Sequence, residues 1–193
     1  LQIVLPFRHY AFAEDTNWTE RNHHFAWHMK LRGKTSAIRF YAIDRHSGEW
    51  AIYDLRPHLK IHQLRRMGRD PFMIRDFARF IQRDFEKRGV PNVMVRAFVL
   101  CSMNGRKPQL MIDPDVDLTQ ENLPPNWIVP LEAEIGGTWD RPVAEWEELV
   151  MHDPIHAELM LSHPPAGTDT SLAETTEAND TVSQTDNENS PAG

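Results

Sequence analysis

A strongly apolar run followed by a tight-turn signal constrains the fold of this chain more than any other feature. Residues 93–102, VMVRAFVLCS, have the composition of a strand buried within a sheet. Asn104 and Gly105 follow, and this pair supplies the two left-handed residues that a two-residue hairpin needs. Residues 107–113, KPQLMID, should return as the antiparallel partner, with Pro108 confining them to an edge or a bulge.

Three segments before this hairpin also have the pattern of strands. Residues 24–31 alternate between apolar and polar positions, residues 36–44 are rich in strand-forming residues, and residues 49–55 alternate again. In outline they predict a three-stranded meander. The segment 127–131, WIVPL, is one further possible strand.

A helix is predicted from residue 71 to about residue 87. Asp70 can accept hydrogen bonds from the first free backbone N–H groups, and Pro71 fits the first helical position because its missing N–H needs no partner there. Gly89 suits the left-handed conformation that ends a helix. The expected buried face recurs at spacings of three and four residues: Ile74, Phe77, Ile81 and Phe85.

Shorter helical segments are expected at 58–67 and, more weakly, at 139–149. The order of these elements indicates the α+β class, with an antiparallel β-sheet packed against one or two helices that cover one face. We therefore expect a single core, because 193 residues with 40% hydrophobic side chains are typical of one soluble domain.

The net charge of −7 conceals an asymmetry along the chain. Residues 1–131 hold 20 Lys and Arg against 14 Asp and Glu, whereas residues 132–193 hold one against 14. From Pro164 onward there is no aromatic residue and no Lys or Arg. Such a segment buries too little apolar surface to offset its ordering entropy, so residues 151–193 are predicted to be a largely disordered acidic tail.

No residue pattern indicates a catalytic or metal-binding motif. The single cysteine, Cys101, excludes a disulfide framework, and its apolar neighbours favour an inert core thiol. No HExxH glutamate, GxSxG motif, phosphate-binding glycine loop or dinucleotide fingerprint is present. Histidine pairs with a spacing of four are favoured as coincidence among ten histidines: His24 and His28, His58 and His62, His152 and His156.

Three alternating carboxylates, Asp113, Asp115 and Asp117, raise the question of a calcium loop. An EF-hand loop that begins at Asp113 needs glycine at its sixth position and glutamate at its twelfth, but Leu118 and Pro124 stand there. A solvated turn at a strand exit is therefore favoured over a different calcium site, and no metal site is predicted.

Two stretches share motifs with a known family. The first, LPFRHYAFAEDTNWTERNHHFAWHMKL, holds Trp18-Thr19 and Trp27 at the family's two-tryptophan spacing. The second, SMNGRKPQLMIDPDVDL followed by WIVPL, holds the family's Asn-Gly-Arg turn and its Asp-Pro-x-Val-Asp segment. In these motifs residues 1–131 resemble the C-terminal lumenal portion of the vitamin K-dependent gamma-glutamyl carboxylase family, including bacterial relatives with an HTTM membrane domain.

The resemblance implies a multi-helix membrane domain that precedes this chain, with residues 1–23 as the connector and residues 24–150 as the lumenal-type domain. In the family, that membrane domain oxidises vitamin K hydroquinone to the epoxide, and the base so formed removes a γ-proton from a peptide glutamate before CO₂ adds. The catalytic lysine and histidine lie there, and no residue here matches them. This chain is therefore expected to be inactive alone, to bind no cofactor itself, and to be extracytoplasmic.

The role that the resemblance implies is substrate binding or scaffolding. The implied partners are the N-terminal transmembrane domain of the same parent and a glutamate-containing peptide or protein. No nucleic acid is expected, because acidic residues on the same helix can pair with the arginine stripe at 75, 79 and 83, which favours a solvated face over a phosphate site. The candidate binding residues are Trp18, Trp27, Arg106, Asp113, Asp115 and Asp117. Structural roles are favoured for them: Trp27 in the core, and Arg106 paired with Asp113 across the hairpin.

A hypothesis of another class stands beside this one. The chain could be a stand-alone protein-interaction domain, because a basic body and an acidic tail in one polypeptide suit autoregulation by the tail. Removing residues 164–193 and measuring partner affinity at low and high salt distinguishes this hypothesis from the first.

Overall fold

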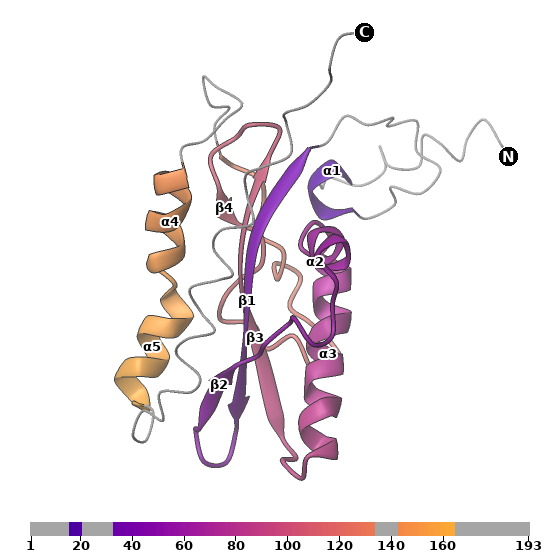
Figure 1. Ribbon diagram of the computed structural model, residues 1–193, viewed down its shortest axis with the longest axis vertical. Helices are drawn as coiled ribbons and strands as arrows, with labels where there is room; N and C mark the ends of the chain where they lie inside the picture. The colour runs from indigo at the N-terminus through magenta and orange to yellow at the C-terminus, as the bar shows by residue number, and fades with distance from the viewer. Residues whose placement is uncertain (1–15, 21–32, 134–142, 165–193) are drawn as a thin grey trace, which may run out of the picture.

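The computed structural model describes residues 16–20, 33–133 and 143–164 of the chain (Figure 1). Its helices and strands are, in chain order, α1 (Thr16–Thr19), β1 (Lys34–Asp44), β2 (Trp50–Ile52), α2 (Ile61–Met67), α3 (Pro71–Lys87), β3 (Val93–Met103), β4 (Gln109–Leu110), α4 (Val143–Met151) and α5 (Pro154–Ser162). The four strands form one antiparallel sheet in the order β2-β1-β3-β4. The α+β class that the sequence predicts is confirmed.

Helices cover both faces of this sheet, whereas the sequence pattern predicts cover on one face. Helices α2 and α3 lie on one side, and α4 and α5 lie on the other (Figure 1). The larger core lies between the sheet and α3, and the smaller one between the sheet and α5. The two sides of β1 serve these cores alternately, because Phe40 and Ala42 belong to the larger core while Tyr41 and Ile43 belong to the smaller.

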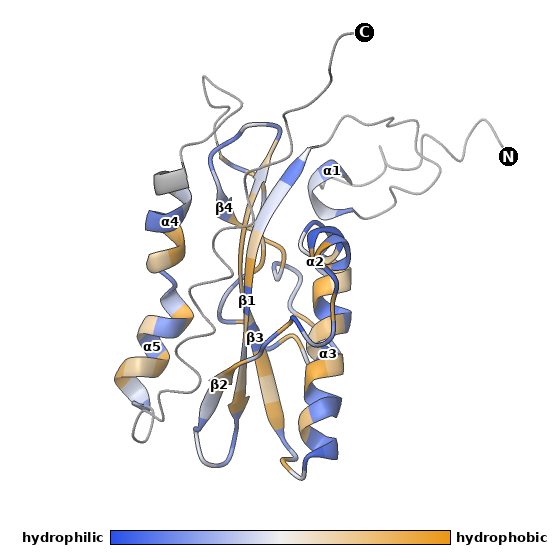
Figure 2. Cartoon of the chain, in the orientation of Figure 1, coloured by the Kyte–Doolittle hydropathy of each residue, from blue (hydrophilic) through white to orange (hydrophobic). Residues whose placement is uncertain are grey.

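The two long strands, β1 and β3, form the centre of the fold. They pair along their whole length, from Lys34 opposite Met103 to Asp44 opposite Val93. Both strands were predicted from their apolar, strand-forming composition, and their register is set by the alternation of two buried faces. Figure 2 shows the apolar character of β1 and β3 in their central and lower parts.

The predicted hairpin after β3 is confirmed at its turn. Asn104 and Gly105 both have positive φ angles, 52° and 74°, and the backbone N–H of Arg106 donates to the carbonyl of Met103 at 3.0 Å. The return strand is much shorter than the predicted 107–113, because β4 contains two residues. Pro108 has no backbone donor, so pairing cannot begin directly after the turn.

The segment 127–131 does not form the strand that its composition suggested. Its ladder contact within the described residues is a single bridge between Ile128 and Ile112. The Gln109 side chain holds the rest of this segment, since it donates to the Pro130 carbonyl at 2.7 Å and accepts from the Ala133 N–H at 2.7 Å. Two backbone hydrogen bonds flank this bridge, from the Val129 N–H to the Met111 carbonyl and from the Asp113 N–H to the Trp127 carbonyl, both at 3.0 Å, and side-chain hydrogen bonds hold the residues beyond it.

The earlier strand predictions have mixed outcomes. The segment 36–44 is confirmed as part of β1, whereas only three residues of 49–55 form β2. The backbone N–H of Tyr53, just beyond β2, still donates to the Phe40 carbonyl at 3.0 Å. The predicted strand at 24–31 lies outside the described residues.

Helix α3 begins and ends where its sequence signals place it. The Asp70 carboxylate accepts from the N–H groups of Phe72 and Met73 at 2.9 and 3.3 Å, and Pro71 occupies the first helical position. Gly89 follows the helix with a φ angle of 85°. The buried face of α3 packs on the sheet through Ile74, Ala78 and Ile81.

The C-terminal helices dock on the opposite face of the sheet. Asp153 begins α5 by accepting from the N–H of Ile155 at 3.0 Å, and its second carboxylate oxygen accepts from the Tyr41 hydroxyl at 2.6 Å and from Arg39 at 3.1 Å. Ile155 and Leu159 are buried against the sheet. The packed part of the chain therefore continues beyond residue 150, into the range assigned to the tail.

Candidate functional site

The acidic loop, residues 112–119, closes one end of the sheet and holds three of the candidate residues. Asp113 shapes the loop itself, because its carboxylate accepts from the Asp115 N–H at 3.0 Å and its carbonyl accepts from the Val116 N–H at 3.2 Å. Its own N–H donates to the Trp127 carbonyl at 3.0 Å. Asp113 is therefore a turn-forming residue.

Asp117 is the buried carboxylate of the acidic loop, with 6% of its surface exposed. One oxygen accepts from the Thr119 hydroxyl at 2.7 Å, from the Thr119 N–H at 3.0 Å and from the Val95 N–H at 3.2 Å, while the other pairs with Arg45. The Val95 N–H belongs to β3, so Asp117 fastens the loop directly to the central strand. Each oxygen is occupied by donors, as a buried carboxylate requires.

Asp115 reaches the other face of the sheet through Arg96. The Arg96 side chain is 8% exposed, and it donates to Asp115 at 2.7 Å, to Glu158 of α5 at 2.8 Å and to the Pro114 carbonyl at 2.7 Å. The hydrogen bond from Arg96 lowers the pKa of Glu158. Arg96 thus links β3, the acidic loop and α5, and its charge is compensated by two partners.

The predicted ion pair between Arg106 and Asp113 is wrong. Arg106 donates to the Ala133 carbonyl at 2.8 Å, and its own carbonyl accepts from the Ser102 hydroxyl at 2.6 Å. Asp113 forms no ion pair with any described residue. The prediction assumed a regular return strand that would carry Asp113 back alongside the turn, but the ladder ends at Leu110, so the two residues are not held across a regular hairpin.

Trp18 joins the N-terminal part of the chain to the domain. Its side chain is 1% exposed and packs in the larger core, and its indole N–H donates to the Val129 carbonyl at 2.7 Å. The Lys34 ammonium lies 5.7 Å from the centre of the indole ring and donates to the Trp18 carbonyl at 2.7 Å and to Glu20 at 2.7 Å. We call this cluster of Trp18, Glu20, Lys34 and Val129 the α1 joint.

The remaining candidate binding residue is Trp27. Trp27 and the pair His24 and His28 lie outside the described residues. Within the part that the structure describes, no group of three or more His, Cys, Asp or Glu side chains could hold a metal ion. The three aspartates of the acidic loop are instead bound to backbone donors and cations. Asp115 is exposed, as a solvated turn predicts, whereas Asp117 is buried.

One cluster of titratable side chains outside the loop resembles a catalytic relay. The Tyr53 hydroxyl donates to Asp84 at 2.8 Å and lies 2.9 Å from Nε2 of His58, whose ring stacks on Tyr53. Burial, reinforced by the Asp84 carboxylate, raises the pKa of Tyr53. A phenol held neutral in this way is a poor base at neutral pH, so this geometry favours a structural role.

The sequence matches a known protein family over most of its length. Residues 1–134 match the family model of the lumenal domain of vitamin K-dependent gamma-carboxylase, which covers more than half of the chain. The chain belongs to this family. No solved structure matches it significantly. The α1 joint, β1, α2, α3, β3 and the acidic loop all lie within the matched residues, whereas α4 and α5 follow them.

Membership in the carboxylase lumenal-domain family implies a membrane-embedded parent. In the described ranges, none of the helices combines the length and the apolar character that crossing a bilayer requires. The residues that the family model matches, 1–134, correspond to the lumenal domain of such a protein.

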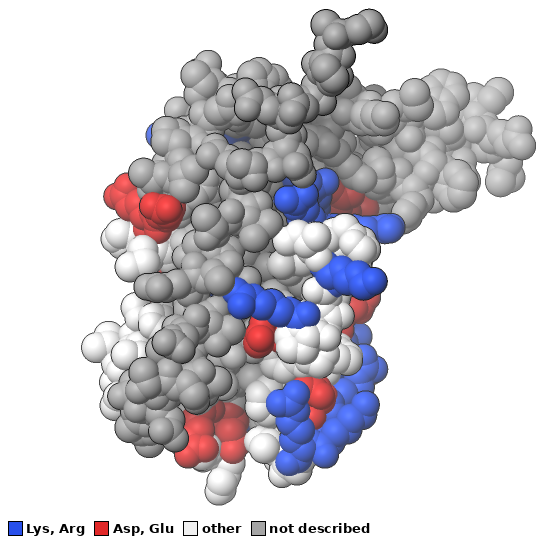
Figure 3. All heavy atoms as spheres, viewed as in Figure 1, with Lys and Arg blue, Asp and Glu red and all other residues white. Residues whose placement is uncertain are grey.

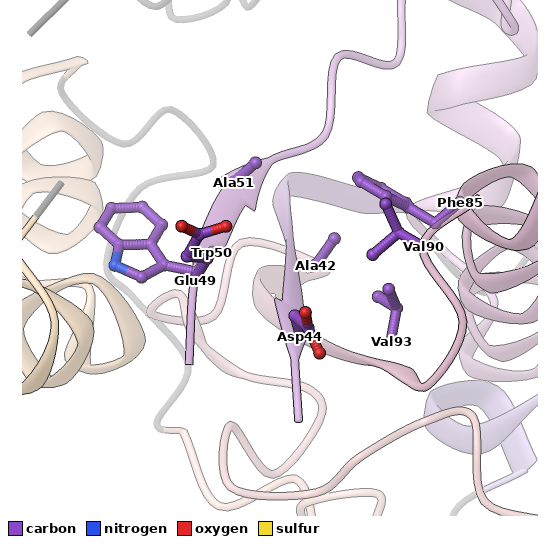
Figure 4. A pocket seen from close by; sticks show the side chains of 8 residues that line it. All are labelled: Ala42, Asp44, Glu49, Trp50, Ala51, Phe85, Val90 and Val93. Carbon is purple, nitrogen blue, oxygen red and sulfur yellow. The ribbon is translucent and has the colours of Figure 1, made fainter. Parts of the chain in front are cut away.

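One pocket of the described residues is smaller than the roughly 300–1,000 Å³ of typical small-molecule sites, so it does not fit vitamin K hydroquinone, the cofactor that the family name implies. This pocket, of about 190 Å³, opens between β1, β2 and the end of α3. Figure 4 shows Ala42, Phe85, Val90 and Val93 converging on it, while the Trp50 indole points away toward α5. Asp44 at its rim is occupied by the turn, because it accepts from the His46 N–H, and this hydrogen bond lowers its pKa. No step of quinone chemistry is assigned to these residues.

Three buried polar residues of this lumenal domain were missed by sequence reasoning: Lys34, Arg96 and Asp153. A signal existed for Arg96, since a single arginine within the apolar run VMVRAFVL must find partners if the strand is buried. A signal also existed for Asp153, because the Asp-Pro pair that begins α3 recurs at Asp153-Pro154 and begins α5. Lys34 had none, since its partners in the α1 joint come from distant parts of the chain.

Cys101 should be unreactive in the folded protein. The thiol is fully buried, and burial raises its pKa to about 12. Compared with an exposed cysteine, its thiolate fraction at pH 8 is lower by roughly a thousandfold, so a maleimide should label the native chain negligibly and the urea-unfolded chain completely. Rapid labelling in the native state, measured by intact mass, would show that the β1–β3 core opens readily.

Proposed function

We propose that this chain is the extracytoplasmic domain of a vitamin K-dependent carboxylase-like integral membrane protein, which aids substrate binding or stabilises the membrane catalytic domain and has no catalytic residue of its own. The observation that carries the proposal is how the family's motif residues are used. Trp18, Arg106 and Asp117 are each bound to backbone groups of this domain. They maintain the fold and leave the chemistry to the membrane domain.

The α1 joint supports a mechanical coupling to the rest of the parent. Helix α1 is held to the domain by the buried Trp18 ring, by its hydrogen bond to Val129, and by Lys34. Because these contacts reach the core, a displacement of the connector would be transmitted to the sheet. A rigid link of this kind suits a domain that positions a bound polypeptide over a separate catalytic site.

The proposal can be tested with the full-length parent protein. With reduced vitamin K, labelled bicarbonate and a glutamate-containing peptide, the full-length protein should incorporate the label, whereas the 193-residue chain alone should not. Tyr53→Phe and His58→Ala remove the relay-like cluster without touching the core contacts of the α1 joint. Both full-length variants should keep the turnover number within about twofold, since general acid–base groups contribute roughly 100-fold or more.

Two results would contradict the proposal. Incorporation by the 193-residue chain alone would place the catalytic groups within it. A fall in turnover number of about 100-fold in His58→Ala, with unchanged folding by circular dichroism, would make the Tyr53 cluster part of the catalytic machinery. A rise in KM for the peptide alone would instead agree with a role in substrate binding.

A further inference from the structure

The helix α2 and its flanks form the most strongly basic surface of the described residues. Between Asp54 and Asp70 the chain has no acidic residue, and it has five basic ones, which we call the cationic surface: Arg56, Lys60, Arg65, Arg66 and Arg69. All five side chains are exposed. Figure 3 shows Lys and Arg side chains over α2 and α3, whereas acidic side chains gather over α4.

The carboxylates nearest to Lys60, Arg65 and Arg66 are bound to other groups. Asp54 accepts from the Arg56 backbone N–H at 3.0 Å, Asp70 caps α3, and Glu20 is bound by Lys34. No carboxylate in the described ranges forms an ion pair with Lys60, Arg65 or Arg66. Exposed like charges this close repel one another, and a partner that carries negative charge would relieve that repulsion.

An apolar side chain lies among these cations. Ile61, the first residue of α2, is 48% exposed, next to Lys60. The far end of α3 is different, because its basic residues are interleaved with acidic ones, and Arg88 is paired with Asp84. An exposed aliphatic side chain beside the cations Lys60, Arg65 and Arg66 is the composition of segments that lie at a bilayer surface.

The cationic surface lies at the end of the domain where α1 enters. The Lys34 ammonium donates both to the Trp18 carbonyl of α1, at 2.7 Å, and to the Arg69 carbonyl just after α2, at 3.0 Å. One nitrogen atom therefore joins the two segments. In Figure 1, α1 and α2 lie together near the upper end, and the C-terminal end of α3 lies at the lower end.

We propose that the cationic surface binds the anionic phospholipid headgroups of the membrane in which the parent protein sits, with Ile61 inserted among them. The orientation rests on the proposed function, because it assumes that the connector before α1 comes from a membrane domain. Cations near an anionic bilayer gain from its surface potential within about a Debye length, so the same end of the domain must face the membrane.

The observations favour a bilayer over an acidic polypeptide as the partner. Residues 132–193 of this same chain are acidic, and they would also be attracted to the cationic surface. An acidic polypeptide, however, would gain nothing from the exposed Ile61, whereas a headgroup layer accommodates both the cations and the aliphatic side chain. The position of the cationic surface beside α1 is a second feature that agrees with a membrane as the partner.

Vesicle sedimentation with the 193-residue chain tests the proposal. The chain should bind vesicles of phosphatidylcholine with 40% phosphatidylglycerol at low salt, and not vesicles of phosphatidylcholine alone. The double variant R65E/R66E should lower the partition coefficient at least ~10-fold, because each basic residue near such a surface contributes about fivefold. Ile61→Ala should weaken binding about twofold to fivefold through lost apolar contact.

The matched control is R83E/K87E on α3, which changes the net charge by the same amount at two exposed positions away from α2. This control should keep binding within about threefold, since charges more than a Debye length from the bilayer are screened. Equal loss in both double variants, or no binding to the anionic vesicles, overturns the proposal. Two further outcomes assign the surface to acidic polypeptides instead. In the first, Ile61→Ala binds the vesicles unchanged and soluble polyglutamate displaces the chain from them. In the second, the chain without residues 164–193 binds both vesicles and polyglutamate more tightly.

These results do not depend on carboxylation. The vesicle assay uses no cofactor and no glutamate substrate, so an inactive parent with intact vesicle binding would remove the proposed function and leave the membrane-binding surface standing. An active parent whose lumenal domain does not bind anionic vesicles would support the proposed function and remove the membrane-binding surface.

Discussion

A Trp18→Ala variant should be the most destabilised single substitution in this domain, with a loss of about 3–5 kcal/mol in the free energy of unfolding. The ring is 1% exposed and packs in the larger core, so its removal leaves a large cavity. The Val129 carbonyl loses its donor, and the Lys34 ammonium loses the ring beside it. Urea unfolding of the 193-residue chain, followed by circular dichroism, measures the loss.

A matched variant separates the ring from its hydrogen bond. Trp18→Phe keeps an aromatic ring in the core and removes the indole N–H, so it should cost about 1–3 kcal/mol, mainly for the Val129 carbonyl left without its donor. The contradicting result is a free energy of unfolding of Trp18→Ala that lies within about 1 kcal/mol of that of the unsubstituted 193-residue chain. In that case the α1 joint is not part of the cooperative core, and the proposed coupling through it fails.

An Asp117→Ala variant should lose roughly 2–4 kcal/mol in the free energy of unfolding. The substitution leaves the Val95 N–H and the Thr119 groups without an acceptor and also removes the partner of Arg45. The expected loss stays below the full cost of breaking a buried pair, because the Arg45 side chain is 48% exposed and water compensates part of its charge.

Asp115→Ala is the control for this prediction, two residues away in the same acidic loop. The Asp115 side chain is 82% exposed, and Arg96 keeps Glu158 and the Pro114 carbonyl as partners, so this change should cost less than about 1 kcal/mol. Urea unfolding midpoints of both variants give the comparison. Equal losses at the two positions would show that burial of Asp117 does not decide the stability of the loop.

Local signals predicted the parts of the fold that depend on nearby residues. Asp70, Pro71 and Gly89 determine where α3 begins and ends, and Asn104-Gly105 determines the turn after β3, because each acts through its own backbone geometry. The composition of β1 and β3 was equally informative, since both are buried on two faces. These elements contain just over half of the buried residues of the larger core.

The parts that sequence reasoning did not predict depend on contacts between distant segments. The return strand has only two residues, the Gln109 side chain binds the backbone at Pro130 and Ala133, and Arg106 donates to the Ala133 carbonyl instead of pairing with Asp113. The cover of α5 on the second face follows from contacts of Asp153 with Tyr41 and Arg39, more than 100 residues earlier in the chain. A periodicity within α4 or α5 carries no information about these partners.

We propose that this domain lies on the extracytoplasmic side of a membrane as part of an integral membrane protein. Its buried Cys101 gives a direct test, because the only cysteine of the domain is shielded from reagents. Lys107→Cys places an exposed thiol next to the hairpin turn. The full-length parent with this substitution is treated with a membrane-impermeant maleimide in intact cells or in sealed vesicles of known orientation, with the unsubstituted parent as background.

Labelling at residue 107 from the extracytoplasmic side, in protein that remains in the membrane fraction, is the result that the account predicts. Labelling that appears only when the reagent reaches the cytoplasmic side, or recovery of the parent protein in the soluble fraction, would contradict it.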